Sequence, residues 1–158
     1  MILQGVDASG KDGTVRRIFS AVNPLGCRVY GFKKPTEEEF SHDFLWRIHK
    51  VTPPKGMIHI FNRSQYEDIL VPTVLGLESE EVINKRYDQI NEFEALLESN
   101  GTKIIKCYLH ISKEEQLERL TERIENPMKH WKHNDGDWHS RKLWDDYMKV
   151  YENIFKKC

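Results

Sequence analysis

Cysteine is scarce in this sequence, and long apolar runs are missing. The 158 residues include three cysteines, Cys27, Cys107 and Cys158, which form no C-x-x-C pair. An odd number of widely spaced cysteines suits a reducing compartment better than a disulfide framework. The apolar lead at residues 1–3 is far too short for a signal peptide or a membrane span. These features predict a cytoplasmic protein with no membrane partner.

An excess of charge of either sign is also missing. Lys and Arg together number 24 against 25 Asp and Glu, and the formal net charge at pH 7 is -1. Proteins that wrap nucleic acid by bulk electrostatics carry a clear basic excess, so this balance argues against a nucleic-acid partner. Any polyanion site must therefore be local. A chain of this length can bury one sizeable core, and we expect a single domain over residues 1–158.

The beginning of the chain carries a glycine-spaced loop. An apolar lead at residues 1–4 is followed by Gly5, Gly10 and Lys11, which match the spacing G-x-x-x-x-G-K. In such a P-loop, backbone N–H groups form a nest for phosphate, and a helix N-terminus and a lysine add positive charge. The expected phosphate-binding residues of the loop are Gly5, Ala8, Ser9, Gly10, Lys11, Asp12, Gly13 and Thr14. Asp12 stands where the motif has a Ser or Thr that touches magnesium, and an ordinary glycine turn is the alternative interpretation.

Hydrophobic spacing predicts an α/β fold with one parallel sheet. We expect strands at residues 1–4, 27–32, 57–61 and 103–111, and helices at 14–23, after Thr36, at 79–99, after Ser112 and at 138–157, with an irregular polar segment at 126–136. Strands that alternate with helices pair in parallel, and the helices flank the sheet. The helix after Thr36 is expected to bury Phe40, Phe44, Leu45 and Ile48.

Polar residues follow two of the expected strands. Lys33 and Lys34 come after the second strand, and Asn62 and Arg63 come after the third. Ligands bind at the carboxyl ends of the strands in an open α/β sheet, so we expect these residues near the loop. The two lysines are expected to line an anion channel, and a solvated basic turn is the alternative.

Three motifs, in order, make the chain resemble the polyphosphate kinase type-2 family. Residues 5–14, GVDASGKDGT, are similar to the phosphate loop of that family. Residues 60–68, IFNRSQYED, resemble its second phosphate-site motif, and residues 123–132, RIENPMKHWK, resemble its lid. The resemblance covers nearly the whole chain. It implies a P-loop kinase three-layer fold, with a parallel sheet flanked by helices and a helical lid at residues 123–142.

The resemblance also implies an activity. Family members transfer phosphate between inorganic polyphosphate and adenine or guanine nucleotides, use Mg²⁺ with Mn²⁺ as an alternative, and tend to form homo-oligomers. The family usually has aspartate where Asn62 stands. One class that looks like this chain has Asn followed by Arg-Ser-x-Tyr-Glu-Asp and phosphorylates both nucleoside monophosphates and diphosphates. We therefore expect AMP and ADP as acceptors, with direct in-line transfer.

Phosphoryl transfer requires charge neutralisation and positioning, which suggests roles for particular residues. Lys11 and the loop amides are expected to hold phosphates, Arg63 to offer a fork of donors, and Arg123 to act as an arginine finger on the lid. Lys129 and Lys132 extend the positive rim. By resemblance, Asp7 acts with the magnesium ion. The expected nucleotide-acceptor residues are Asn62, Tyr66, Glu67 and Asp68, and Glu67, Asp68 or Glu94 would supply metal ligation that the neutral amide of Asn62 supplies poorly.

Simpler interpretations exist for several of these residues. Asp7 is alternatively an acceptor of backbone N–H bonds in the loop, and Arg123 a surface residue paired with Glu122, Glu125 or another acid. A zinc site at His130, His133, His139, Asp135 and Asp137 is disfavoured because the spacing lacks a closed ligand set. Tyr66, Trp131 and Trp138 either stack on a nucleobase or pack against their own domain.

Two other functions share part of this pattern. An ATP-dependent nucleoside monophosphate kinase would have the same loop, sheet and lid, and a nucleotide- or polyphosphate-binding module would have them without turnover. Family members usually have a segment before the loop and a further strand and tail after the lid helix. We therefore expect either a sheet one strand short or a sequence trimmed from a longer one.

Overall fold

The computed structural model describes residues 1–158, apart from the side chain of Phe19. The described residues form a parallel sheet with the order β2-β3-β1-β4. Its strands are β1 (Ile2–Gln4), β2 (Cys27–Gly31), β3 (Ile58–Asn62) and β4 (Lys106–Tyr108). β1 lies between β3 and β4 and is buried throughout. The predicted α/β fold with a parallel sheet is confirmed.

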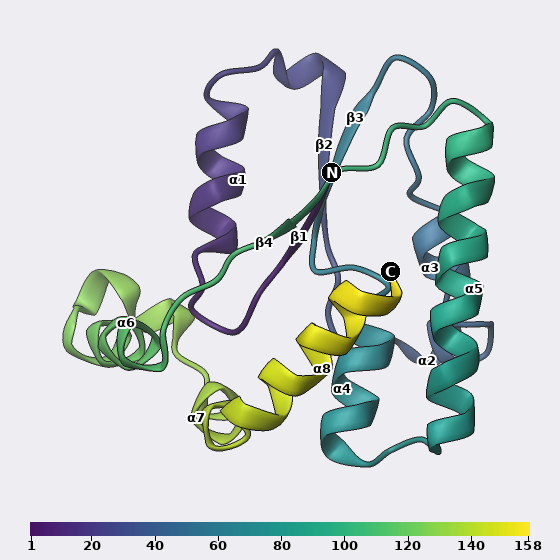
Figure 1. The fold of residues 1–158 in the computed structure, drawn as a ribbon. Coiled ribbons are helices and arrows are strands. Elements are labelled where there is room, and N and C mark those ends of the chain that lie inside the picture. The colour runs from purple at the N-terminus through teal and green to yellow at the C-terminus, as the bar shows by residue number, and fades with distance from the viewer.

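Helices cover both faces of this sheet, as Figure 1 shows. α1 (Lys11–Phe19) lies on one side, and α3 (Trp46–His49), α4 (Glu67–Leu75), α5 (Glu80–Ser99) and α8 (Trp144–Lys157) lie on the other. The main core fills the second side, with Ile48, Ile69 and Ile90 fully buried. Of the described helices, none combines the length and the apolar composition that crossing a membrane requires.

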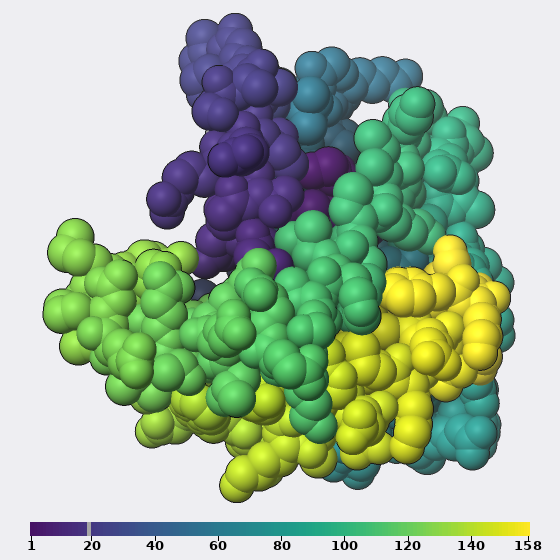
Figure 2. All heavy atoms as spheres, turned by 60° about the vertical axis from the view of Figure 1, so that its left-hand side comes forward, coloured from purple at the N-terminus to yellow at the C-terminus, as the bar shows by residue number. Residues whose placement is uncertain are grey.

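The predicted lid, residues 123–142, comprises the end of α6 (Lys113–Glu125), the 3₁₀ helix η2 (Pro127–Lys132) and α7 (Asp135–Lys142). We call α6, η2 and α7 together the lid. In Figure 2 this segment, drawn in green, forms a lobe beneath the purple α1. Side-chain caps begin each part of the lid, because Ser112, Asn126 and Asn134 accept hydrogen bonds from Glu115 N, Met128 N and Gly136 N. The segment predicted to be irregular therefore contains a 3₁₀ helix and the first turn of α7.

The expected helix after Thr36 is split into two short helices. The capping box between Thr36 and Glu39 is present, but α2 (Glu37–Phe40) ends after one turn and leaves Phe40 66% exposed. Asp43 Oδ1 accepts from Leu45 N and begins a new turn that leads into α3. The prediction of one helix that buries Phe40 is wrong, because local side-chain bonds end the first helix and begin the second.

Other differences concern where elements begin and end. α1 begins at Lys11, three residues earlier than predicted, because Gly10 is left-handed and closes the loop there. β4 is shorter than predicted, since its partner β1 offers only three residues to pair with. The expected terminal helix is interrupted at Leu143, between α7 and α8. α4 was not predicted, and it contains Pro72.

Candidate active site

The loop between β1 and α1 has the backbone conformation of a phosphate-binding nest. Gly5, Ala8 and Gly10 have φ values of 151°, 62° and 101°. A Cβ atom at Gly5 would lie 2.7 Å from Ser9 Oγ and 2.8 Å from the Leu109 carbonyl oxygen. The chain therefore requires glycine at this position for both backbone and steric reasons. Such a loop turns successive N–H groups toward an anion.

Lys11 folds back over this loop. Its Nζ donates to the carbonyl oxygens of Gly5 and Val6 at 2.6 and 2.9 Å, and it approaches Ser9 Oγ at 3.4 Å. The residue is 8% exposed, and burial lowers its pKa, with further lowering from nearby Arg63. The ammonium group is thus buried against the carbonyl oxygens of the loop itself.

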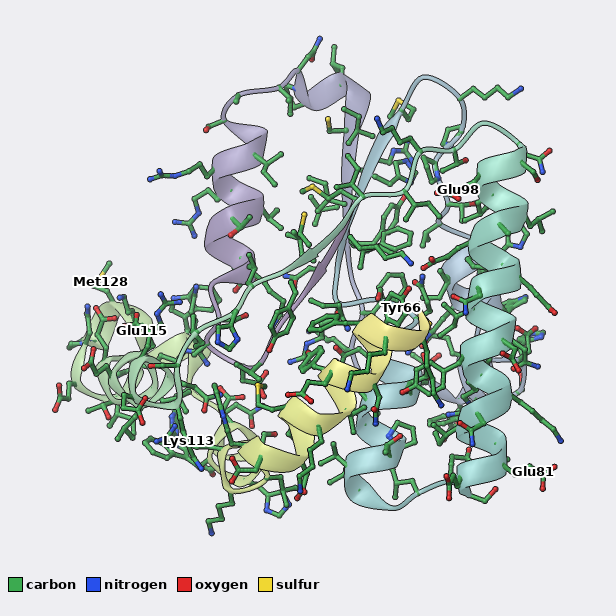
Figure 3. The ribbon with its side chains drawn as sticks, viewed as in Figure 1. Tyr66, Glu81, Glu98, Lys113, Glu115 and Met128 are labelled. Atoms are coloured by element: carbon green, nitrogen blue, oxygen red, sulfur yellow. The ribbon has the colours of Figure 1, made fainter. Side chains whose placement is uncertain are left out.

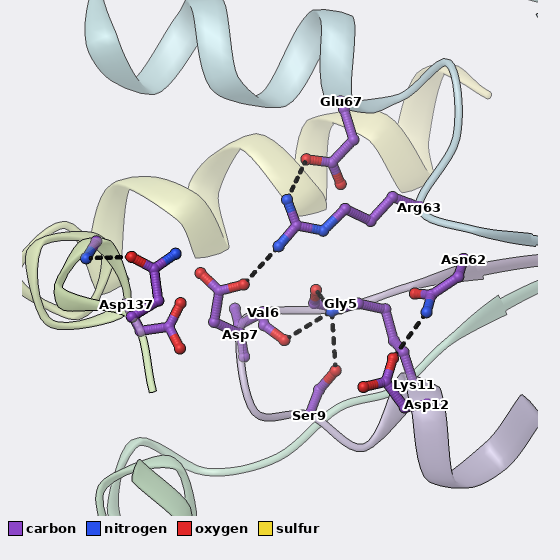
Figure 4. A network of polar contacts seen from close by, with 12 residues as sticks. Gly5, Val6, Asp7, Ser9, Lys11, Asp12, Asn62, Arg63, Glu67 and Asp137 are labelled. Atoms are coloured by element: carbon purple, nitrogen blue, oxygen red, sulfur yellow. Dashed lines mark hydrogen bonds and ion pairs between the residues drawn. The ribbon is translucent and has the colours of Figure 1, made fainter. Parts of the chain in front are cut away.

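Arg63 joins the end of β3 to the loop. Its backbone is left-handed, with a φ of 68°, and such strain in a residue other than glycine is typical of functional sites. Nη2 donates to Asp7 Oδ1 at 2.7 Å, and Nη1 lies 3.9 Å from Glu67 Oε2, so the guanidinium lies between two carboxylates (Figure 4). Burial raises the pKa of Glu67, and the charge of Arg63 offsets part of that increase. Arg63 is therefore fixed by residues of two other elements.

Asn62 and Asp12 connect the second motif to the start of α1. Asn62 Nδ2 donates to Asp12 Oδ1 at 2.8 Å, and Lys132 Nζ of the lid lies 3.6 Å from Asp12 Oδ2. Burial acts to raise the pKa of Asp12, but the Asn62 hydrogen bond and the charge of Lys132 outweigh it and hold the pKa below its usual value. The residue that replaces the usual Ser or Thr thus joins the loop to the lid.

Arg123 is held inside the lid by an acidic partner. Its Nη1 donates to Asp137 Oδ2 at 2.5 Å and to the Lys132 carbonyl oxygen at 3.4 Å. Asp137 is 8% exposed, and its pKa is raised by burial and by the charge of Asp7 across the cleft. The neighbouring Lys129 forms an ion pair with Glu122. The acid paired with Arg123 is therefore Asp137 rather than Glu122 or Glu125.

These elements enclose a cleft of about 840 Å³ between the loop, the strand ends and the lid. The Lys and Arg side chains that line it are Lys11, Lys33, Lys34, Arg63, Arg119, Arg123, Lys129 and Lys132. The acidic side chains on its lining are fewer, namely Asp7, Asp12, Glu122 and Asp137. Although the whole chain is nearly neutral, the cleft concentrates positive charge where an extended polyanion can lie.

A family model described as polyphosphate kinase 2 (PPK2) matches residues 1–158. The chain belongs to the polyphosphate kinase 2 family. It is 53% identical over 157 residues to an AMP/ADP-polyphosphate phosphotransferase of Meiothermus ruber, an alignment that covers 99% of this chain and 59% of that protein. It is 38% identical over 146 residues to a polyphosphate:AMP phosphotransferase of Pseudomonas syringae pv. tomato, covering 92% of this chain and 29% of that protein.

A solved structure of polyphosphate kinase 2 from Arthrobacter aurescens TC1 has the same fold. The TM-score is 0.96 at 48% sequence identity, over 99% of this chain and 55% of that one. The chain spans a little under 60% of the length of the first two curated relatives that it matches.

Most residues predicted from the motifs of this polyphosphate kinase 2 chain meet in the cleft. Its lining includes Asp7, Lys11, Asn62, Arg63 and Arg123, with Ala8, Ser9, Gly10, Asp12, Gly13, Lys33, Lys34, Lys129 and Lys132. Trp131 also lines it. Gly5 and Thr14 lie outside this lining. The Thr14 N–H is engaged in the first turn of α1, where it donates to the Gly10 carbonyl oxygen.

Tyr66 and Glu94 are placed differently from the prediction. The Tyr66 hydroxyl donates to Glu94 Oε1 at 2.8 Å, Gln65 Nε2 donates to the same oxygen, and Lys106 Nζ lies 2.5 Å from Glu94 Oε2. Both residues are buried, and Figure 3 shows Tyr66 beside the end of α8, well away from the lid residue Glu115. Glu94, a predicted alternative metal ligand, lies outside the cleft lining, and its buried carboxylate is paired with the exposed Lys106.

Asp68 also lies outside the cleft lining and has a structural partner. Arg47 Nη2 donates to Asp68 Oδ2 at 2.9 Å, and Arg47 Nη1 donates to the Lys33 carbonyl oxygen at 2.9 Å. Arg47 is 6% exposed. Asp68 therefore holds Arg47, and Arg47 in turn holds the Lys33 backbone at the cleft wall. The motifs did not indicate Arg47.

Two side chains of α6 that bond the backbone of the loop were missed, and one of them, Arg119, lines the cleft. Arg119 Nη1 donates to the Ala8 carbonyl oxygen at 3.0 Å, and Gln116 Nε2 donates to the Asp7 carbonyl oxygen at 3.0 Å. The four-residue spacing of Arg119 and Arg123 on one helix face is the signal that would have found the first of these. Among the described residues, the His and Asp side chains weighed as a zinc site form no group of three or more that could hold a metal.

Proposed function

We propose that this chain transfers phosphate between inorganic polyphosphate and AMP or ADP, making ADP and ATP by direct in-line transfer. The observation that carries the proposal is the cationic cleft, in which loop, second motif and lid all present Lys or Arg to one space. The names of the curated relatives, AMP/ADP-polyphosphate and polyphosphate:AMP phosphotransferases, support it.

The cleft residues have different roles in phosphoryl transfer. The loop N–H groups and Lys11 bind the phosphates of the polyphosphate donor. Arg63 neutralises charge on the transferring group, and Asp7 and Glu67 keep its planar guanidinium oriented. Arg123 approaches the same group from the lid and stabilises the charge that spreads over its oxygens in the transition state. A strong general base is unnecessary, because the acceptor phosphate oxygen is ionised at neutral pH.

We propose Mg²⁺ as the cofactor, with Mn²⁺ as an alternative. Asp7 and Asp137 line the same cleft, and the charge of Asp7 is felt at the Asp137 carboxyl group. Mg²⁺ sites in phosphoryl transfer use one or two carboxylates together with substrate phosphates and waters, so this donor set fits the ion. When bound, the ion supplies further neutralisation of the reacting phosphates.

The test is product analysis with the purified chain, polyphosphate, Mg²⁺ and either AMP or ADP. We expect AMP to give ADP and then ATP, with EDTA abolishing turnover and Mg²⁺ or Mn²⁺ restoring it. Accumulation of ADP alone would restrict the chain to monophosphate acceptors. A strict requirement for ATP as donor would contradict the proposal in favour of a nucleoside monophosphate kinase, and the absence of turnover with retained binding would leave a binding module.

Three further properties concern the nucleotide base, the oligomeric state and the cellular compartment. We propose that guanine nucleotides also serve, which parallel reactions with GMP and GDP test. A homo-oligomer is supported by the exposed apolar side chains of Leu25, just before β2, Val29 in β2 and Ile58 at the start of β3, and sedimentation velocity tests it. A cytoplasmic location is supported by the free thiols of Cys27, Cys107 and Cys158.

A further inference from the structure

Ala8 has a strained backbone in the middle of the phosphate loop. Its φ is 62°, in the left-handed region that an alanine side chain disfavours. Gly5 and Gly10, the other loop residues with positive φ, avoid this strain because they have no Cβ atom. A strained conformation of this kind persists only where surrounding contacts hold it, so the contacts on either side of Ala8 matter for the shape of the nest.

Helix α6 supplies these contacts. Gln116 Nε2 donates to the Asp7 carbonyl oxygen at 3.0 Å, and Arg119 Nη1 donates to the Ala8 carbonyl oxygen at 3.0 Å. These two carbonyl groups belong to the peptide units before and after the Ala8 Cα atom. Two side chains three residues apart, on one face of α6, therefore hold both peptide planes that define the Ala8 backbone.

The directions of these carbonyl groups decide where the loop N–H groups point. In a trans peptide unit the C=O and the N–H point in opposite directions, so the bond from Gln116 turns the Ala8 N–H away from that side chain. Among the described residues, no acceptor bonds to this N–H, whereas the Ser9 N–H donates to the Val6 carbonyl oxygen at 3.1 Å. The Ala8 N–H is therefore available as a donor of the nest for an anion.

Gln116 is itself held in one orientation. The residue is 1% exposed, and its Oε1 accepts from Arg141 Nη1 of α7 at 3.3 Å. Arg141 Nη1 also donates to the Lys113 carbonyl oxygen at 2.5 Å. Because a guanidinium can only donate, it fixes Oε1 on its own side and leaves Nε2 to face the Asp7 carbonyl. Gln116 is not part of the described lining of the cleft, so it acts on the cleft through the loop.

We propose that Gln116 is a positioning residue of the phosphate loop, which holds the peptide unit between Asp7 and Ala8 so that the Ala8 N–H faces the donor phosphates. The inference rests on the proposed function, because it takes inorganic polyphosphate as the anion of the loop. Arg119 holds the next peptide unit and also lines the cleft with its charge. Gln116 is uncharged, so replacing it tests the backbone effect without altering the cationic lining.

The test uses two variants that release the loop and one matched control. Gln116→Met keeps the length of the side chain and removes the donor to Asp7. Arg141→Met frees Gln116 Oε1, and it decides the test if Gln116→Met does not fold. Leu120→Ala is the control, because Leu120 is 2% exposed on the same helix and makes none of these bonds, so its loss destabilises α6 alone. Thermal melts identify a temperature at which every variant is folded.

Calorimetric titration with inorganic tripolyphosphate and with AMP is the readout, because it needs no turnover. Tripolyphosphate is short, so its binding depends more on the loop than that of a long chain that meets many cations. We expect Gln116→Met to weaken tripolyphosphate binding by roughly tenfold or more, which is the effect of one lost hydrogen bond to a charged group. Arg141→Met should weaken it by about threefold, and Leu120→Ala should leave it within about twofold.

AMP distinguishes this role from a contact with the nucleotide. Gln116 also borders a smaller cavity beside the cleft, so the AMP affinity of Gln116→Met shows whether the residue acts there instead. We expect that affinity to stay within about twofold of the wild type. Loss of AMP binding with unchanged tripolyphosphate binding would overturn the proposal.

A second substitution in the loop tests whether the effect passes through Ala8. Glycine adopts a left-handed backbone without the cost that alanine has, so Ala8→Gly added to Gln116→Met should restore at least threefold of the lost tripolyphosphate affinity. Added to Leu120→Ala, the same substitution should restore nothing. A purely structural role of Gln116 predicts no such difference between the two backgrounds.

Three results would overturn the positioning role. They are unchanged tripolyphosphate binding in folded Gln116→Met and Arg141→Met variants, an equal loss in Leu120→Ala at a similar melting temperature, and no recovery on adding Ala8→Gly. The proposed function fails separately, because the dependence of tripolyphosphate binding on Gln116 would stand even if no phosphate were transferred to AMP or ADP.

Discussion

Alanine at Gly5 should destabilise the chain, whereas alanine at Gly13 should stabilise it. At Gly5 the backbone has a φ of 151°, and the new Cβ would lie 2.8 Å from a backbone carbonyl oxygen, that of Leu109, which cannot rotate away. Left-handed backbone costs about 1–2 kcal/mol for an L-residue, and overpacking adds about 1–3 kcal/mol. We expect a loss of about 3 kcal/mol in the free energy of unfolding, or roughly 6–12 °C in Tm for a domain of this size.

Alanine at two other glycines separates the backbone strain from the steric overlap as causes of the lost stability. Gly76 ends α4 with a φ of 63°, and a Cβ there would meet no described heavy atom within 4 Å, so Gly76→Ala should cost only the backbone strain of about 1 kcal/mol. Gly13 lies within α1, and a Cβ there would likewise meet no described heavy atom within 4 Å. Gly13→Ala should therefore stabilise the chain by roughly 0.5–1 kcal/mol, because alanine is the better helix former.

Urea unfolding followed by circular dichroism, with thermal melts, measures all three variants against the wild type. The expected order of stability is Gly13→Ala, wild type, Gly76→Ala, Gly5→Ala. A Gly5→Ala variant as stable as Gly76→Ala would refute the steric argument at the loop. A destabilised Gly13→Ala variant would refute the helical assignment of that residue.

Three further predictions concern the site and its pH dependence. Lys11→Ala should lower kcat/KM by roughly a hundredfold, about 3 kcal/mol, because it removes a preorganised charged donor, and wild-type turnover of the folded variant would remove Lys11 from the mechanism. Arg123→Lys should lower kcat far more than it raises KM, because an ammonium keeps the charge but cannot reproduce the planar fork of the guanidinium. If Arg123→Lys and Arg123→Ala both turn over normally with unchanged melts, Arg123 has no role in transfer, and Lys129 and Lys132 are then the candidate charges of the lid. Burial raises the pKa of Tyr108 to about 12 and also raises the pKa of Tyr151. Their contribution to stability is therefore fully present below pH 10 and is lost as the pH rises above it, by up to about 1.4 kcal/mol per pH unit for a buried phenol. A free energy of unfolding in urea that stays constant between pH 10 and 12, with tyrosinate absorbance rising before unfolding, would contradict this.

The local sequence pattern was sufficient to predict the structural elements that depend only on neighbouring residues. The loop glycines, the Thr36 capping box, the Ser79 cap of α5 and the alternation of strands and helices were all predictable, because each is determined within a few residues of chain. Boundaries were less predictable where polar side chains compete with the helix, as at Asp43 and Asn134.

The family motifs identified most of the residues that line the cleft, but not their partners. Arg63 and Asp7 are 56 residues apart in sequence, Asn62 and Asp12 are 50 apart, and Arg119 reaches the Ala8 carbonyl across 111 residues. Glu94 was, with Glu67 and Asp68, an alternative metal ligand in the sequence, but the fold pairs its carboxylate with Lys106 outside the cleft lining. Spacing along the chain predicts which residues share a helix face or follow a strand. The sheet order and the packing of the lid decide which charged side chains meet, because those contacts join segments whose separation in sequence carries no periodic signal.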